Sequence, residues 1–349
     1  MRAAQYTEHG GPEVLSIVDL PDPEPGPTDV VVAVEACALN RLDVVQRNGW
    51  FTLDGFSLPH VAGMDVAGTV VSAGVDSDAS QVAVGDRVVV DPSLVGVDPR
   101  SKLAGRGDLH GELGVIGANA DGGYAELCLA PASHVYRVPD TLPIEHASTF
   151  PTCHLTASHA LFDVARLSAG ETVMIHAAGS GVSVAAIQLA KRAGATVLAT
   201  AGSQSKLDRA LDLGADHVVN NRVGDLAAWA REITDGRGVD VVFDHVGTAL
   251  FAPSIFSLAV GGRLVSCGNT SGDEAVIPSL GYLFHNRIAV LGSDAYRPDE
   301  FGPAWDTFCT GDFAVHIEQE YPLDEAGAAQ EHLASGDVFG KIVLRPRES

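Results

Sequence analysis

The chain has 349 residues, of which 46% are hydrophobic; this is enough for a large core and favours about two domains. Its 45 acidic residues outnumber the 22 basic ones, and the net charge of −23 argues against nucleic acid or an anionic membrane as a partner; a salt-rich cytosol or a GC-rich genome would each explain such a bias. Because the sequence has neither an apolar run of about 18 residues nor a recognisable signal peptide, we expect a cytoplasmic protein without a membrane anchor.

The first third of the chain predicts short β-strands separated by turns. The strand-like segments are DVVVAVEACAL (29–39), VAGTVVSAG (66–74), GDRVVV (85–90) and YAELCLAP (124–131). Strands at this spacing, with turn signals between them, indicate an antiparallel, barrel-like domain.

A regular alternation of strands and helices begins near Glu171. The strand-like segments are ETVMIHAA, TVLATA, HVVN, VDVVFDHV, GRLVSCG and RIAVLGS, and helical segments such as SVAAIQLAKRAG lie between them. This alternation predicts a parallel, doubly wound sheet. The closing strand GKIVLRP indicates a return to the first domain, so we place the domains at residues 1–153, 154–294 and 295–349.

The turn after the first strand of this sheet is built from small residues. Small side chains let the backbone approach a pyrophosphate, and the N-terminus of the next helix offers N–H groups to the anion. The strict G-x-G-x-x-G pattern is absent, because Ala178, Ser180 and Ser183 stand at its glycine positions, and a tight turn without a ligand is the alternative. The residues that we assign to the pyrophosphate are Ala178, Gly179, Ser180, Gly181 and Val182.

The second strand of the sheet distinguishes between the two nicotinamide dinucleotides. An NAD site has an acidic residue at the end of this strand, whereas this chain has Ala201, Gly202 and Ser203. Hydroxyls and cations suit the 2′-phosphate of NADPH, so we assign it to Ser203 and Lys206, with Arg209 as a further candidate. The alternative for Lys206 is a solvated helix residue. The predicted cofactor is NADPH.

Ten motifs along nearly the whole chain are similar to those of one protein family. They are ALNRLDVVQRNG, LPHVAGMDVAGTVVSAG, VGDRVVV, GGYAEL, LTASHAL, AAGSGVSVAAIQLAK, LGADHVVN, GRGVDVVFDHVG, GGRLVSCG and FGKIVL. With them the chain resembles a medium-chain dehydrogenase/reductase, most closely the quinone oxidoreductase-like branch. The resemblance implies an α/β fold: a GroES-like, β-rich catalytic domain from both ends of the chain, a central Rossmann domain, and an active site in the cleft between them.

The resemblance also allows a test for a catalytic zinc ion. Zinc alcohol dehydrogenases of this family bind the metal with a cysteine, the histidine of a Gly-His-Glu, and a second cysteine. The matching positions hold Asn40, then Met64 and Asp65, with Thr152 near the third. An amide, a thioether and a hydroxyl are poor zinc ligands, so we expect no catalytic zinc.

The long polar segment VGVDPRSKLAGRGDLH (95–110) matches a lobe that holds a structural zinc ion in zinc-bearing relatives. The four cysteine positions hold Gly96, Pro99, Lys102 and His110, and one ligand cannot complete a tetrahedral site. We therefore expect the lobe to be a mobile remnant that depends on local packing or a subunit contact. The chain's cysteines have no C-x-x-C spacing and are Cys37, Cys128, Cys153, Cys267 and Cys309.

Without a metal to stabilise an alkoxide, oxidation of a simple alcohol is unfavourable. Hydride transfer to a conjugated acceptor develops a delocalised charge that hydrogen-bond donors can stabilise. The favoured substrates are therefore quinones, enones and other α,β-unsaturated carbonyl compounds. Two alternatives remain open: an alcohol or aldehyde dehydrogenase of the same superfamily, and an NADPH-binding redox sensor with little turnover.

Several residues are candidates for the catalytic site and the substrate pocket. Asn40 can donate its amide N–H to a substrate carbonyl, and His154 can donate a proton near neutral pH or be a structural histidine, the same alternative that applies to His60. Trp50 and Phe51 stand where related enoyl reductases often have a tyrosine proton donor, which favours a flat, quinone-like acceptor or protonation from water. The remaining candidates are Asp43 and Asp65, whose alternative is loop stabilisation, and Met64 in the pocket.

The resemblance extends the cofactor site and suggests an assembly. Further contacts along the cofactor are expected from Thr156, Asn221, Val246, Gly268, Asn269, Ser293 and Lys341, with ordinary turns as the alternative for the glycines. Relatives usually dimerise through the edge of the Rossmann sheet, which GGRLVSCG and RIAVLGS could supply here. We expect a homodimer, with a tetramer as the alternative.

Overall fold

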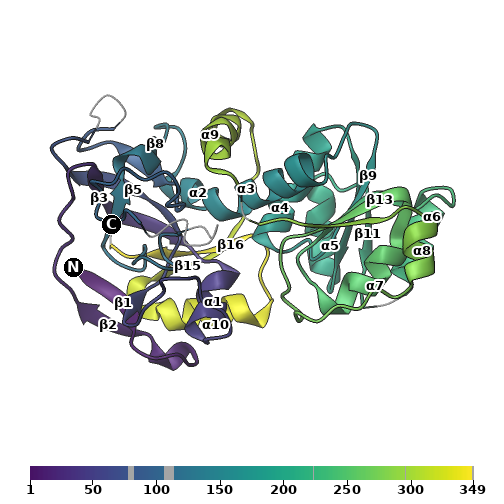
Figure 1. The fold of residues 1–349 in the computed structure, drawn as a ribbon, viewed down its shortest axis with the longest axis horizontal. Coiled ribbons are helices and arrows are strands. Elements are labelled where there is room, and N and C mark those ends of the chain that lie inside the picture. The colour runs from purple at the N-terminus through teal and green to yellow at the C-terminus, as the bar shows by residue number, and fades with distance from the viewer. Residues whose placement is uncertain (78–81, 106–113, 223, 295, 348–349) are drawn as a thin grey trace. The chain divides into compact units, whose positions relative to one another are not determined.

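The computed structural model describes residues 1–77, 82–105, 114–222, 224–294 and 296–347 (Figure 1). The chain divides into two compact units. Unit 1 comprises Met1–Thr152 and Phe301–Ser349, and unit 2 comprises Cys153–Glu300. The boundaries expected from the sequence lie one residue after the first junction and six residues before the second.

Unit 1 is built around a seven-stranded sheet with β3 (Asp29–Ala38) at its centre. This strand is buried along almost its entire length, which explains its nearly continuous run of apolar residues. It pairs antiparallel with β5, β7 and β16. The remaining strands of the sheet are β5 (Asp65–Ala73), β6 (Arg87–Val90), β7 (Leu127–Pro131), β8 (Val135–Arg137), β15 (Ile317–Pro322) and β16 (Lys341–Arg345).

A second, three-stranded sheet and short helices complete unit 1. The sheet has the order β2-β1-β4, formed by β2 (Ser16–Asp19), β1 (Arg2–Tyr6) and β4 (His60–Val61). The helices are α1 (Arg41–Arg47), α2 (Ile144–Ser148), α9 (Phe301–Thr310) and α10 (Ala326–Ser335). α9 is anchored by aromatic packing: the rings of Trp305 and Phe308 lie 5.0 and 5.1 Å from that of Phe150. This packing holds the start of the second segment of unit 1, which begins at Phe301, against the first segment.

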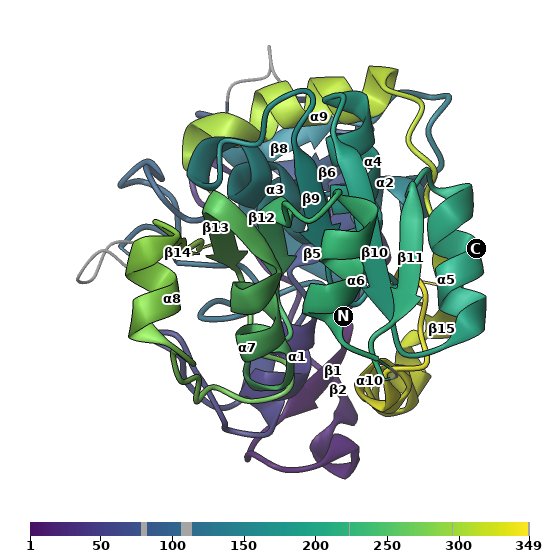
Figure 2. The ribbon, with the colours of Figure 1, turned by 90° about the vertical axis from the view of Figure 1, so that its right-hand side faces the viewer.

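Unit 2 contains a six-stranded parallel sheet with the order β11-β10-β9-β12-β13-β14, and its strands lie side by side in this order in Figure 2. The strands are β9 (Thr172–Ile175), β10 (Thr196–Ala201), β11 (His217–Asn220), β12 (Val239–Asp244), β13 (Leu258–Ser266) and β14 (Ala289–Gly292). The order of the strands reverses between β9 and β12, and open α/β sheets bind ligands outside the carboxyl ends of the strands at such a point. The predicted doubly wound sheet and the β-rich first domain are both confirmed.

The helices of unit 2 pack against this sheet in two pairs. α4 and α5 pack on β9, β10 and β11, whereas α7 packs on β12 and β13 and carries α6 beside it. Right-handed crossovers on either side of a reversal place the two helix pairs on opposite faces of the sheet. The helices are α4 (Gly181–Arg192), α5 (Gln204–Asp212), α6 (Leu226–Ile233), α7 (Thr248–Ser257) and α8 (Leu280–His285), and α3 (Pro151–Ser158) spans the first junction. In the described part of the chain, no helix is both long and apolar enough to cross a membrane.

The described part of the polar lobe is held by contacts within unit 1. The backbone N–H of Lys102 donates to Asp29 Oδ2 (2.8 Å), and the ammonium of Lys102 donates to a backbone carbonyl (2.6 Å). Arg100 pairs with Asp98 and Asp76 at 2.9 and 2.8 Å. Local packing therefore holds the lobe up to residue 105. His110 lies outside the described residues, and mobility of the lobe stays a prediction.

Candidate active site

Three segments converge at the carboxyl end of β3. The sheet register pairs Ala38, the last residue of β3, with Asp65 at the start of β5 and with Val343 on β16. Asn40 follows two residues after Ala38, and Lys341 begins β16. Residues that lie 301 positions apart in the chain, Asn40 and Lys341, are thereby brought into hydrogen-bond contact.

The side chains at this point form a buried ionic group, which we call the Lys341 cluster (Asn40, Asp65, Thr152 and Lys341). The Lys341 ammonium donates to Asn40 Oδ1 (2.8 Å) and to Asp65 Oδ2 (3.0 Å). Asp65 Oδ1 accepts from the backbone N–H (3.0 Å) and the hydroxyl (2.6 Å) of Thr152. Asp65 is completely buried, and Lys341 is only 5% exposed. Both oxygens of the carboxylate are therefore occupied.

The cluster also determines which way the Asn40 amide points. An ammonium can only donate hydrogen bonds, so the atom of Asn40 that faces it must be the carbonyl oxygen. The amide nitrogen then lies on the other side, where its contact with the carbonyl of Ala38 is long, at 3.4 Å. Asn40 is thus oriented as a hydrogen-bond donor, as its assignment to a substrate carbonyl requires.

Asp43 lies directly behind this group. Its Oδ2 accepts from the backbone N–H of Asn40 (2.8 Å) and from the hydroxyl of Tyr124 (3.1 Å). Burial raises the pKa of Asp43 to about 7, although these hydrogen bonds and the nearby Lys341 cation act in the opposite direction. The carboxyl group therefore holds the start of α1 and titrates near neutrality.

Two further predicted site residues, His154 and Lys341, are buried in the structure. Burial, together with the nearby Arg192 cation, lowers the pKa of His154 to about 4, which favours its alternative as an uncharged structural histidine. The ammonium of Lys341 is bound to Asn40 and Asp65 inside unit 1, and its contact with the cofactor stays a prediction. Burial was the property that the sequence did not reveal in either case.

The remaining predicted residues of unit 1 differ in exposure. Trp50 and Phe51 are 69% and 52% exposed, so their rings are accessible within unit 1. Met64 is buried next to Asp65, and His60 is buried with its Nε2 3.1 Å from the carbonyl of Gly117. His60 is thus a structural histidine of the β4 region.

In unit 2, the predicted pyrophosphate turn lies between β9 and α4. Ala178 is anchored by its backbone N–H, which donates to the carbonyl of Thr200 on β10 (2.8 Å). Ser180 has extended backbone angles and α4 begins at Gly181, so the first N–H groups of a twelve-residue helix lie directly after the turn. Unpaired N–H groups and the helix dipole make such a terminus suitable for an anion.

A buried histidine network behind this turn was not assigned from the sequence. The hydroxyl of Ser183 donates to the carbonyl of His176 (2.7 Å), so it must accept from the Nε2–H of His245 (2.8 Å). Burial lowers the pKa of His176 to about 3 and that of His245 to about 4, so both rings are neutral. The network ties the β9–α4 turn to the end of β12. The sequence signal for this network was the presence of two histidines, each directly after one of two strands that pair in the parallel sheet.

A cation that was also missed lies at the end of β10. If residue 202 had a Cβ, that atom would lie 2.8 Å from Nε and 3.2 Å from Nη2 of Arg222, so the guanidinium lies directly against Gly202. Ser203, with its hydroxyl 3.3 Å from that of Ser205, precedes α5, which carries Lys206 in its first turn. Arg222 follows β11, the neighbour of β10 in the sheet. The position of Arg222 directly after the strand that pairs with β10 was the signal by which this cation could have been found.

The other predicted cofactor residues of unit 2 lie on loops that contact one another. The backbone N–H of Val246 donates to Asp244 Oδ1 (2.7 Å), and Ser271, in the loop after β13, donates its N–H to the carbonyl of Val246 (2.8 Å). Gly268 and Asn269 belong to this loop, Ser293 follows β14, Asn221 follows β11, and Thr156 lies on α3. Except for Thr156, these residues follow the carboxyl ends of parallel strands, as a dinucleotide site of this type requires.

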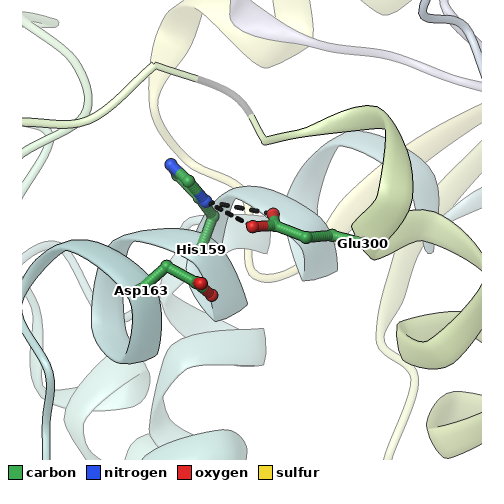
Figure 3. A group of neighbouring side chains, drawn as sticks. All are labelled: His159, Asp163 and Glu300. Atoms are coloured by element: carbon green, nitrogen blue, oxygen red, sulfur yellow. Dashed lines mark hydrogen bonds and ion pairs between the residues drawn. The ribbon is translucent and has the colours of Figure 1, made fainter.

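A second ionic group, which we call the Arg297 cluster (His159, Asp163, Arg297, Asp299 and Glu300), lies near the two ends of unit 2. Figure 3 shows His159 and Asp163 on one helical turn, facing Glu300. His159 Nδ1 lies 3.0 Å from both oxygens of Glu300, and Arg297 pairs with Glu300 (3.0 Å), Asp163 (3.1 Å) and Asp299 (3.2 Å). The histidine and carboxylates could hold a metal ion. Since the guanidinium of Arg297 already pairs with these carboxylates, we interpret the cluster as an ion-pair network.

The comparisons with known proteins agree on the fold, but the relatives carry two different activity names. Family models described as alcohol dehydrogenase GroES-like domain and zinc-binding dehydrogenase match residues 26–140 and 181–309. A quinone oxidoreductase of Pseudomonas aeruginosa is 31% identical, with 98% of each chain covered. A solved structure named as an NAD-dependent alcohol dehydrogenase is 39% identical, with a TM-score of 0.92 and coverage of 99% of this chain and 100% of that one. A mycobacterial protein solved in complex with NADPH is 31% identical, with a TM-score of 0.81 and the same coverage.

Proposed function

The chain belongs to the medium-chain dehydrogenase/reductase superfamily, and we propose that it is an NADPH-dependent, zinc-independent reductase that transfers hydride to a quinone, an enone or another α,β-unsaturated carbonyl compound. The observation that carries the proposal is the Lys341 cluster. A cation of the protein itself occupies the point at which Asn40, Asp65 and Thr152 meet.

The residues of this cluster do not fit a zinc ion. Both oxygens of Asp65 already accept hydrogen bonds, and an ammonium would lie beside any metal bound there. Asn40 and Met64 offer an amide oxygen and a thioether in place of thiolate and imidazole, which zinc prefers. Zinc bound by these side chains would require the loss of the Lys341 ion pair, and this supports chemistry without a metal.

A conjugated acceptor suits the donors that remain. NADPH, when bound, supplies a hydride to the acceptor, and a proton from water completes the reduction. Asn40 donates its amide N–H to the carbonyl oxygen on which negative charge develops. Because delocalisation already spreads this charge over a quinone or an enone, one neutral donor suffices there, whereas a simple alkoxide needs a metal ion or a comparable group. The exposed rings of Trp50 and Phe51 are suited to stack on a flat acceptor.

The end of β10 favours NADPH over NADH. Ala201, Gly202 and Ser203 provide no carboxylate for the ribose hydroxyls, whereas Arg222 over Gly202 and Lys206 in the first turn of α5 provide cations for a 2′-phosphate. The NADPH complex of the mycobacterial relative supports the same cofactor here.

One observation favours a second candidate, an NAD-dependent alcohol dehydrogenase. The solved structure with that name is 39% identical, more than the quinone oxidoreductase of Pseudomonas aeruginosa at 31%. An alcohol dehydrogenase with this site would need a metal ion or another group to stabilise the alkoxide.

We also propose that the enzyme acts in the cytoplasm as a homodimer formed through the edge of the parallel sheet. β14 is an edge strand, and Val290 on it is 43% exposed. Leu280 and Phe284 of the neighbouring α8 are 68% and 62% exposed. An apolar sheet edge of this kind promotes pairing with a second copy.

The experiment compares cofactors and acceptors in the presence and absence of EDTA. We expect tighter binding of NADPH than of NADH by fluorescence titration, and EDTA-insensitive oxidation of NADPH with 1,4-benzoquinone and with a simple enone. Zinc bound in stoichiometric amounts, together with oxidation of primary alcohols by NAD⁺, would establish the second candidate instead. Tight NADPH binding without turnover of any acceptor would contradict both.

A further inference from the structure

We infer that Lys341 is a positioning residue of the active site: its ammonium fixes the orientation of the Asn40 amide, so that Asn40 donates an N–H group to the substrate oxygen. The inference rests on the proposed function, because it concerns the group that stabilises the developing negative charge. It gives the buried lysine a role in turnover without a direct contact with the substrate.

The first step of the argument is the symmetry of the amide group. The two ends of an asparagine amide have nearly the same shape, but one donates and the other accepts hydrogen bonds. A carbonyl acceptor that gains negative charge needs the donating end. The Lys341 ammonium, 2.8 Å from Oδ1, permits only the orientation in which Oδ1 faces inward. The nitrogen is therefore directed away from Lys341.

The second step is the fixed position of the ammonium itself. Lys341 starts a strand that pairs with β3, and its Nζ is also bound to Asp65 Oδ2 at 3.0 Å. Asp65 is in turn held by two hydrogen bonds from Thr152. Neither the Lys341 ammonium nor the Asp65 carboxylate can move away without leaving the other as an unpaired buried charge, which destabilises the folded state. The amide of Asn40 thus rests on a rigid support.

The third step is that a purely structural role explains this lysine poorly. A buried ion pair is often no more stabilising than apolar side chains of similar size, so its presence in a core calls for another reason. The chain contains only four lysines among its 349 residues, and the other three are Lys102, Lys191 and Lys206. Orientation of a catalytic amide is a reason that the geometry supplies.

A double-mutant cycle tests the inference, with Asn40→Ala, Lys341→Met and the combined variant compared with the wild-type enzyme. Each single variant is expected to lower kcat for 1,4-benzoquinone about 10- to 100-fold, with the Kd for NADPH changed less than about twofold. If Lys341 acts through Asn40, the double variant loses no more activity than Asn40→Ala alone. Multiplicative losses, or a folded Lys341→Met enzyme with unchanged kcat, would overturn the inference.

Two further variants keep the test decisive if Lys341→Met fails to fold. Lys341→Met/Asp65→Asn removes both buried charges and is expected to fold, but to keep the low kcat because nothing orients Asn40; wild-type kcat in this variant would contradict the inference. Lys191→Met is the matched control, since it removes a lysine whose ammonium lies 2.8 Å from Asp216 in unit 2, outside the Lys341 cluster.

A binding measurement separates this inference from the proposed function. 4-Nitrophenolate, a stable mimic of the enolate oxygen, is titrated into the NADP⁺ complex and followed by its absorbance. We expect Asn40→Ala and Lys341→Met to weaken its binding about tenfold each and without additivity; equal binding by all variants, or none by the wild type, would refute the positioning role. If the wild-type enzyme reduces no acceptor, the proposed function fails, and the phenolate titration still decides the role of Lys341.

Discussion

The Lys341 cluster and the Arg297 cluster each pair a cation with one or more carboxylates, but they differ in burial. The Lys341 ammonium is 5% exposed and serves one carboxylate and one amide. The Arg297 side chain is 54% exposed and serves three carboxylates. Buried charges are strongly dependent on their partners, whereas exposed pairs contribute little because water and salt replace them. Similar ion pairs can thus fix a functional group in one place and merely tie segments together in another.

The largest expected effect is on the free energy of unfolding of Lys341→Met. This substitution leaves the fully buried carboxylate of Asp65 without its cation, which is expected to reduce the stability by about 3–5 kcal/mol. Urea denaturation followed by fluorescence measures the loss. In Lys341→Met/Asp65→Asn most of the stability should return, and an unchanged midpoint for Lys341→Met would remove the contrast between the clusters.

The second prediction concerns the pH dependence of the free energy of unfolding, which reports on the carboxyl group of Asp43 near the Lys341 cation. The pKa of Asp43 is about 7 in the folded protein and about 3.9 in an unfolded chain, so the folded state binds the extra proton between these values. Stability therefore falls as the pH rises from about 4 to about 7, by up to a few kcal/mol, and the loss is complete above pH 7.

Asp43→Asn lacks this titration. Its stability relative to the wild type should therefore increase from pH 4.5 to pH 7.5 in urea denaturation experiments, since asparagine can still accept a hydrogen bond from the backbone N–H of Asn40. A difference that stays constant over this range would mean that Asp43 titrates in the folded protein as it does in the unfolded chain.

Arg222 extends the comparison, because it is an exposed cation and the partner that we expect for it is the 2′-phosphate of NADPH. Arg222→Met should weaken NADPH binding about tenfold, because one charged contact to a phosphate is lost, and leave NADH binding unchanged. Fluorescence titration with both dinucleotides measures this, and Arg237→Met, which removes an exposed arginine paired with Asp240, is the control. Equal weakening of NADPH and NADH would exclude a contact with the 2′-phosphate.

The smallest effect is expected for Arg297→Met. Its ion pairs are half exposed, so the free energy of unfolding should change by less than about 1 kcal/mol, and by less still in 1 M salt. Denaturation curves at low and high salt give the answer. A loss as large as that of Lys341→Met would show that exposure does not separate the two clusters.

The fold and the turn between β9 and α4 followed from local patterns in the sequence. Strand and helix periodicity predicted the parallel sheet, and the small residues from Ala178 to Val182 marked the turn and the start of α4, which begins at Gly181. Both features depend on residues that are close together in the chain, and local pattern is a direct guide to such features.

The Lys341 cluster and the charge states did not follow, for physical reasons. The contact between Lys341 and Asn40 depends on how β16 pairs with β3, and Arg222 reaches Gly202 only because β11 lies beside β10. These pairings join distant segments. The pKa of His154 depends on its burial, which arises from the complete fold.

The contact between His159 and Glu300 has a consequence for the ancestry of the chain. It brings residues near the beginning and the end of unit 2 within 3.0 Å of each other, so the polypeptide enters and leaves this unit at neighbouring points. A domain with adjacent ends can be inserted into a host protein, or exchanged for another, without rethreading the host. Unit 2 therefore has the adjacent ends that insertion into a host protein, or exchange for another domain, requires.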